Sequence, residues 1–400
     1  MRRLHTLFLL FSLCLTSVYA QSSGTGFIGD GYYRVRNNKT NRYIYVTDNK
    51  DYYDKTKDVG DFQAIQLWTD INRGIGDPAT VIYIDEVTSG MFDLAGQGTS
   101  IHALTGYYVG VTKLTDGTYK VSASVSKSGI EVTKTLSDDE SSTTKEQGKM
   151  GTNGSPTYQK WVVDRITTDN TTNYFGIKPT IELNGSYYQP FFADIPFRAA
   201  SPGMNIYYVS KLAGEYALMT PIEDVVPAKT PVIIECATAD PSQNRLELLA
   251  TSSAQVTGNQ LSGVYFCNGA RPQASTSAYK KFDSTKMRVF DVVDGKLVLT
   301  NSPASSRLNN IKAIDWEEYE ETRIDCLFAN SSYLEAKATT PDVLELTLDL
   351  TDIKSISSND DEKMEAGVYS INGTLLRATD DIKGLPAGIY IVGGRKIAVK

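Results

Sequence analysis

The segment RVFDVVDGKLVLT, residues 288–300, decides the fold class of this chain. Two runs of apolar and β-branched residues flank Asp294-Gly295, and an Asp-Gly pair between such runs is typical of a two-residue β-hairpin turn. Helical periodicity is scarce in the rest of the sequence. Short strand-like runs bounded by Gly, Asn, Asp or Pro recur at 32–46, 81–87, 118–126, 230–237 and 367–378. The sequence therefore predicts an all-β protein.

The first twenty residues, 1–20, have the layout of a secretory signal peptide. Arg2 and Arg3 precede an apolar run that ends at Leu15, and Ala20 occupies the position before the expected cleavage. This run is shorter than a membrane-spanning helix, and no later apolar run is long enough to cross a bilayer. We therefore expect a secreted or cell-surface protein without a transmembrane segment.

Composition argues against several classes of partner and cofactor. The net charge is −7 and no basic patch is visible, which disfavours nucleic acid. No Cys-x-x-Cys or other metal-ligand spacing occurs, so we expect neither a metal nor another cofactor. Cys236, Cys267 and Cys326 follow the signal segment. Export permits one disulfide among them, and burial as three small apolar residues is the alternative.

Two Gln-x-Trp triplets mark the N-terminal region, Gln66 to Trp68 and Gln159 to Trp161. Together with the strand pattern of 31–46 they resemble the ricin-type β-trefoil family, in which three repeats pack around a pseudo-threefold axis and the Trp is a core anchor. The resemblance implies a β-trefoil-like domain over 25–183. The polar, Ser/Thr-rich segment 126–157 is expected to be a surface insertion in it.

Sugar-binding trefoils of this family use an early Asp and a nearby aromatic side chain. The resemblance places Asp93 at that position in the second repeat, and Asp48 lies three residues beyond the matching position in the first. Paired tyrosines next to Asp and Asn could stack on a sugar ring; the alternative is that strand tyrosines simply alternate between core and surface. The candidate ligand-binding residues are Asp48, Tyr52, Tyr53, Asp93 and Tyr107.

The middle region resembles a β-sandwich segment common in secreted proteins of Bacteroidota. The segments that carry this resemblance are 191–235, with its Val226-Pro227-Ala228 turn, and the strand GVYF at 263–266. The resemblance implies an antiparallel β-sandwich over 184–338, to which no catalytic role is attached. A linker at 339–362 is expected to follow.

The last segment, 363–400, is expected to be a small β domain. Its sequence VYSINGTLLRATDDIKGLPAGIYIVGGRKIAVK, residues 368–400, resembles the C-terminal sorting domain of the type IX secretion system. The residues that match the sorting pattern include Pro386, Gly388, Tyr390 and Lys396. The resemblance implies that secretion machinery is a partner, whereas a structural cap on the middle domain is the alternative.

Three functions remain open at this stage. We favour a non-catalytic binding protein for a glycan or an extracellular, host-matrix protein. The second is a secreted glycoside hydrolase that uses the carboxylates of DWEEYEE, residues 315–321. The third is a structural cell-envelope protein without a small ligand. We do not expect an enzyme, because no nucleophile motif occurs and His102 is the one histidine beyond the signal segment.

Overall fold

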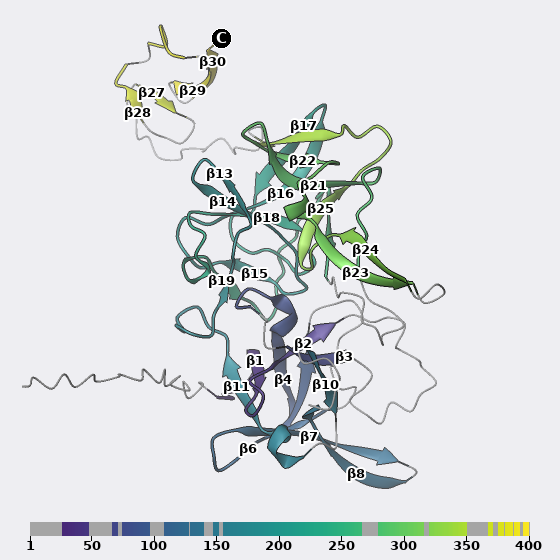
Figure 1. Ribbon diagram of the computed structural model, residues 1–400. Helices are drawn as coiled ribbons and strands as arrows, with labels where there is room; N and C mark the ends of the chain where they lie inside the picture. The colour runs from purple at the N-terminus through teal and green to yellow at the C-terminus, as the bar shows by residue number, and fades with distance from the viewer. Residues whose placement is uncertain are drawn as a thin grey trace, which may run out of the picture. The chain divides into compact units, whose positions relative to one another are not determined.

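The structure is a computed structural model. It describes residues 26–47, 66–70, 74–96, 108–127, 129–139, 147–151, 155–265, 279–315, 320–349, 367–370, 375–379, 381–386, 388–392 and 395–399. Within these ranges the helical pieces are short 3-10 turns, η2 (Pro78–Thr80), η3 (Pro156–Gln159), η4 (Pro241–Gln243) and η5 (Ser305–Arg307), and all other elements are strands (Figure 1). The all-β prediction is confirmed. The chain forms two compact units, Met1–Asp349 and Leu350–Lys400.

The N-terminal part of the first unit, the trefoil, has the strand pairing expected of a β-trefoil. Six strands pair in a closed ring, in the order β1, β4, β5, β6, β7, β11 and back to β1. The contact between β5 and β6 is the bridge from Phe92 to Val109. The ring strands are β1 (Gly31–Asn37), β4 (Ile82–Thr88), β5 (Met91–Ala95), β6 (Gly110–Lys113), β7 (Tyr119–Lys127) and β11 (Trp161–Arg165).

The strand register shows three equivalent repeats. In each repeat, an aromatic residue on the first ring strand pairs with an apolar residue on the last. These pairs are Tyr33 with Ile82, Phe92 with Val109, and Tyr119 with Trp161. Between repeats, Val35 pairs with Val163, Leu94 with Ile84, and Val121 with Val111. Eleven of these twelve side chains are buried in one core and Val111 packs against it, because alternate residues of a strand point to the same side.

Hairpin strands extend the first and third repeats. They are β2 (Tyr43–Thr47), β3 (Gln66–Asp70), β8 (Ile130–Thr135), β9 (Ser137–Asp139) and β10 (Gln147–Gly151). Three of these strands lie inside segment 126–157, where the sequence favours a surface insertion. Leu136 is fully buried there, and its carbonyl accepts a 3.0 Å hydrogen bond from Trp161 Nε1. Part of the expected insertion therefore belongs to the core.

A buried ion pair explains how so polar a segment enters the core. Arg42 Nη2 lies 2.6 Å from Asp138 Oδ1, and its Nε donates to Asp138 Oδ2 at 2.9 Å. The two side chains are only 7% and 0% exposed. Two parallel hydrogen bonds satisfy both charges, so the carboxylate can be buried without an unpaired charge.

The rest of the first unit is a β-sandwich. One half contains β13 (Ile181–Leu183), β14 (Ser186–Phe191), β18 (Val232–Cys236), β16 (Asn205–Ala213) and β17 (Tyr216–Pro221), in spatial order. The other contains β26 (Val343–Leu348), β22 (Lys296–Thr300), β21 (Met287–Val293), β25 (Ser331–Glu335) and β20 (Leu261–Val264). In the described ranges these pairings are antiparallel except that of β17 with β26, which is parallel. Apolar side chains of both halves form one core between them.

The structure moves two boundaries of the sandwich relative to the sequence expectation. β13 lies before residue 184 and already belongs to the sandwich sheet. β26 lies inside the expected linker 339–362, and its Leu344 is fully buried. Glu345 and Thr347 alternate with the buried Leu344 and Leu346, so the strand has a period-two pattern although its polar residues and the flanking Asp342 and Asp349 resemble a linker in composition.

The central strand β18 is buried on both faces. Its Ile233 faces the sandwich core, whereas Val232, Ile234 and Cys236 face a second core. A three-stranded sheet covers this second core, formed by β12 (Phe175–Gly176), β19 (Arg245–Leu248) and β15 (Phe197–Ala199). Cys236 is a free thiol, and burial together with the charge of Glu235 raises its pKa to about 12. Cys326 is also buried, and Cys267 lies outside the described residues.

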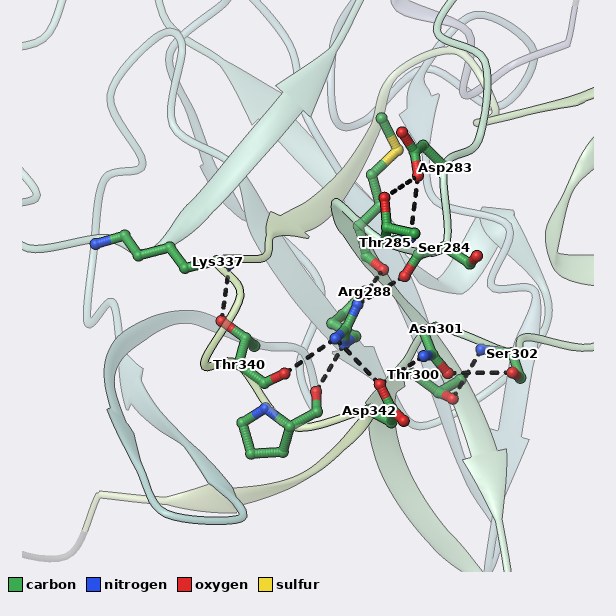
Figure 2. Close-up of polar contacts among 12 residues, drawn as sticks. Asp283, Ser284, Thr285, Arg288, Thr300, Asn301, Ser302, Lys337, Thr340 and Asp342 are labelled. Carbon is green, nitrogen blue, oxygen red and sulfur yellow. Dashed lines mark hydrogen bonds and ion pairs between the residues drawn. The ribbon is translucent and has the colours of Figure 1, made fainter.

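The hairpin predicted at 288–300 is β21–β22. Asp294 and Gly295 have φ values of 51° and 71°, as a two-residue turn of this kind requires. At the start of β21, the buried Arg288 guanidinium binds the loop that leads into β26 (Figure 2). It donates to the carbonyls of Thr340 at 3.0 Å and Pro341 at 2.7 Å. This arginine therefore fixes the entry of the strand that joins the two halves.

Arg34, on the outer side of β1, connects the trefoil to the sandwich. Arg34 is 4% exposed, and its guanidinium donates to Asn173 Oδ1 at 2.7 Å and to the Tyr174 carbonyl at 2.8 Å. Tyr32 donates to the Leu249 carbonyl at 2.7 Å. One side of the trefoil is therefore covered by the segment that leads into the sandwich and by the sandwich itself.

The second unit is a four-stranded antiparallel sheet. Its order is β28 (Leu375–Arg377), β27 (Val368–Ser370), β29 (Gly388–Val392) and β30 (Arg395–Val399). Tyr390 is buried, and its hydroxyl donates to the Pro386 carbonyl at 2.9 Å. Gly388 starts β29, and Lys396 lies in β30. The small β tail predicted from the sequence is present.

Candidate functional site

The outer face of the second trefoil repeat brings two carboxylates and a tyrosine together. Asp85 on β4 pairs with Asp93 on β5. The bridge between Phe92 and Val109 places Tyr108 opposite Asp93 on the other side. Two paired strand positions and the residue next to the bridge therefore place Asp85, Asp93 and Tyr108 in one row.

The strand pattern directs these side chains away from the core. Phe92 and Leu94 are 6% and 2% exposed, so Asp93 between them points to the outside of the barrel. Val109 is fully buried and Tyr108 beside it is 53% exposed. Asp85 is exposed, and Asp93 is partly exposed with its Oδ1 atom buried.

The tip of the β4–β5 hairpin adds apolar surface to this row. Met91, two residues before Asp93, is 36% exposed, and Val87 is 40% exposed. The Glu86 N–H donates to Asp30 Oδ1 at 2.9 Å, and the Gly90 N–H donates to Glu86 Oε1 at 2.8 Å. These two hydrogen bonds fix the conformation of the hairpin tip, and with it the positions of the side chains in the row.

The neighbouring phenols are kept neutral. Burial raises the pKa of Tyr83, and the negative charges of Asp85 and Asp30 act in the same direction. Burial also raises the pKa of Tyr32, whose ring lies 4.9 Å from that of Tyr83. The face is therefore acidic through its carboxylates alone, with uncharged aromatic rings beside them.

This combination suits recognition of hydroxyl groups. Carboxylate oxygens accept hydrogen bonds from sugar hydroxyls, and an exposed tyrosine ring offers an apolar face to CH groups. Among the residues that the structure describes, no group of three or more His, Cys, Asp or Glu side chains could hold a metal ion. In the same ranges, no helix has the length and apolarity of a membrane span.

The structure describes only some of the residues singled out from the sequence. Asp48, Tyr52, Tyr53 and Tyr107 lie outside the described residues. Gln66 and Trp68 are in β3, and Gln159 is in η3. Trp161 is fully buried in the barrel core, where the trefoil resemblance places it.

Asp85 and Tyr108 are the site residues that the sequence reasoning missed, and only Tyr108 had a signal in a segment already singled out. The signal was present in TGYYVGV, residues 105–111. Val109 is a core residue in a strand of alternating sides, so the tyrosine next to it had to face outward.

Within the segment 315–321, Asp315, Glu320 and Glu321 belong to a separate two-stranded ribbon. This ribbon is β23 (Asn309–Asp315) paired with β24 (Glu320–Cys326), and Asp315 pairs with Glu320 at its end. Residues 316–319, including Glu317, lie outside the described residues. A hydrolase site at this position stays a prediction.

Comparison with known proteins gives little further information. No family model matches the sequence, and no curated protein matches it. Among solved structures, the chain is similar to one described as "Structure and mode of action of a mosquitocidal holotoxin", with 10% identity and a TM-score of 0.25. The match covers 78% of this chain and 35% of the toxin chain, so this chain spans about a third of that protein's length. A likeness this weak carries no argument.

Proposed function

We propose that this protein is an exported, non-catalytic binding protein whose trefoil binds a glycan on the outer face of its second repeat. The observation that supports this proposal is the row of Asp85, Asp93 and Tyr108. These side chains combine hydrogen-bond acceptors for hydroxyl groups with an exposed aromatic ring for the apolar face of a sugar. Asp85 and Asp93 lie on paired strands, and Tyr108 is next to the Phe92–Val109 bridge, which favours a preformed site.

A glycan array with the purified chain tests this proposal. We expect specific binding that Asp93→Ala and Tyr108→Ala each weaken at least about tenfold, since charge-assisted hydrogen bonds and aromatic contacts each contribute on the order of 1–3 kcal/mol. Asp224→Ala and Tyr216→Ala are matched controls, because these side chains are also exposed but lie on the sandwich. Binding that survives both trefoil variants, or silence toward every glycan, would refute the proposal.

We also propose that the C-terminal unit acts as an export signal read by secretion machinery. Support comes from its resemblance to type IX sorting domains and from its own small core of Val368, Tyr390 and Val392. The test fuses residues 350–400 to a reporter that carries a signal peptide, in a bacterium with that secretion system. Reporter on the cell surface is the expected result. Equal surface display with Tyr390→Ala, which removes the largest of the three core side chains, would contradict recognition of the folded tail.

A further inference from the structure

The threefold register allows each residue of the candidate site to be matched in the other two repeats. The position that follows the inward aromatic residue is Arg34 in the first repeat, Asp93 in the second and Lys120 in the third. The position that precedes the inward partner is Val81, Tyr108 and Lys160, respectively. The position that Asp85 occupies in the second repeat is taken by Asp164 in the first and by Thr112 in the third.

The first repeat has no accessible equivalent of the site. Arg34 replaces the aspartate and is 4% exposed, with its donors used by Asn173 and Tyr174. Val81 replaces the tyrosine. It is 1% exposed and packs in the second core, the one that the three-stranded sheet covers. This face has become the docking surface for the sandwich.

The third repeat is open but has the opposite chemistry. Lys120 and Lys160 stand in place of the aspartate and the tyrosine, and Thr112 stands in place of Asp85. Lys160 Nζ lies 2.5 Å from Asp116 Oδ2. These three positions therefore supply no carboxylate and no aromatic ring for a sugar.

We infer that the trefoil binds one glycan per chain, although its backbone repeats three times. This inference rests on the proposed function and specifies the valency of the same site. One site per chain means that a single chain cannot cross-link two glycans through its trefoil. Tight attachment of the protein to a glycan-bearing surface then requires several chains side by side, because avidity arises only when several binding sites are occupied at the same time.

Isothermal titration of the full chain measures this valency directly. The probes are the methyl glycosides of galactose, mannose, glucose, N-acetylglucosamine and fucose. The expected stoichiometry for the probes that bind is one per chain. The double variant Lys120→Ala/Lys160→Ala should keep this stoichiometry and change the Kd less than twofold, whereas Tyr108→Ala should raise the Kd at least about tenfold.

The outcomes separate the inference from the proposed function. A stoichiometry of two or three, with one site removed by Tyr108→Ala, would overturn the valency while leaving glycan binding intact. A tenfold loss in the double lysine variant would also overturn it, because the third repeat would then contribute a site. Binding of none of the five probes would overturn the proposed function, and the inferred valency with it.

Discussion

Replacing Asp138 by alanine should destabilise the trefoil strongly, because it leaves the Arg42 guanidinium buried without its carboxylate. The two hydrogen bonds between them measure 2.6 Å and 2.9 Å, and the side chains are 0% and 7% exposed. Removal of one partner of such a buried pair costs about 3–5 kcal/mol. For a domain of about 150–250 residues, 1 kcal/mol shifts the melting temperature by about 2–4 °C, so the expected loss is about 6–20 °C.

The assay is thermal unfolding followed by tryptophan fluorescence. Trp161 lies in the same core and bonds to Leu136, two residues before Asp138, so it reports the unfolding of this part of the chain. Asp116→Ala is the matched control. It removes an equally short ion pair, that with Lys160, whose side chains are 40% and 39% exposed, and we expect little change in melting temperature.

A double variant distinguishes loss of an ion pair from loss of packing. Arg42→Met/Asp138→Leu removes both charges, so the free energy of unfolding should exceed that of Asp138→Ala by about 2 kcal/mol or more. If Asp138→Ala costs less than about 1 kcal/mol, or if the double variant is less stable than the single one, the reasoning about this buried pair is wrong.

Three further predictions concern other buried features. Burial raises the pKa of Asp164 above its ordinary value of 3.8, so the stability that this carboxyl contributes is present below that value and lost as the pH rises through the raised pKa. Asp164→Asn should therefore raise the melting temperature at pH 7 and have little effect near pH 3; an equal effect at both pH values would contradict this. Arg288→Met leaves four carbonyls without the hydrogen bonds that Arg288 donates, so it should lower the free energy of unfolding, measured in urea, by more than about 3 kcal/mol. A loss below about 1 kcal/mol would show that Arg288 does not fix the loop that leads into β26. Gly263→Ala would place a Cβ 2.2 Å from the Phe192 ring and should cost about 1–3 kcal/mol by the same assay, compared with no cost for Gly74→Ala, which has open space.

The sequence predicted those parts of the fold that depend on local patterns. The Asp294-Gly295 turn and its flanking strands follow from turn chemistry and period-two alternation. Trp161 was placed in the core by the Gln-x-Trp resemblance. The expectation that segment 126–157 lies wholly on the surface was wrong. Its polar composition indicates that Asp138 is exposed, whereas the ion pair with Arg42, distant in the sequence, makes its burial possible.

The candidate site was only partly predictable for a related reason. Asp93 was singled out by its position in the second repeat. Its neighbours Asp85 and Tyr108 come from other strands, and their proximity depends on register across the barrel. The first repeat differs from the second because Arg34 stands in place of Asp93 and is buried by the docked sandwich. Nothing in the sequence near Arg34 predicts that burial.

The position of β26 has a consequence for the order in which the chain can fold. The trefoil ring closes once β11 has paired with β1, whereas the two halves of the sandwich are joined through β26, the last strand of the first unit. As the chain emerges from a ribosome, the trefoil can therefore finish first. Until β26 arrives, β17 and β22 present open strand edges that invite intermolecular pairing. Products that end before residue 343 should accordingly aggregate.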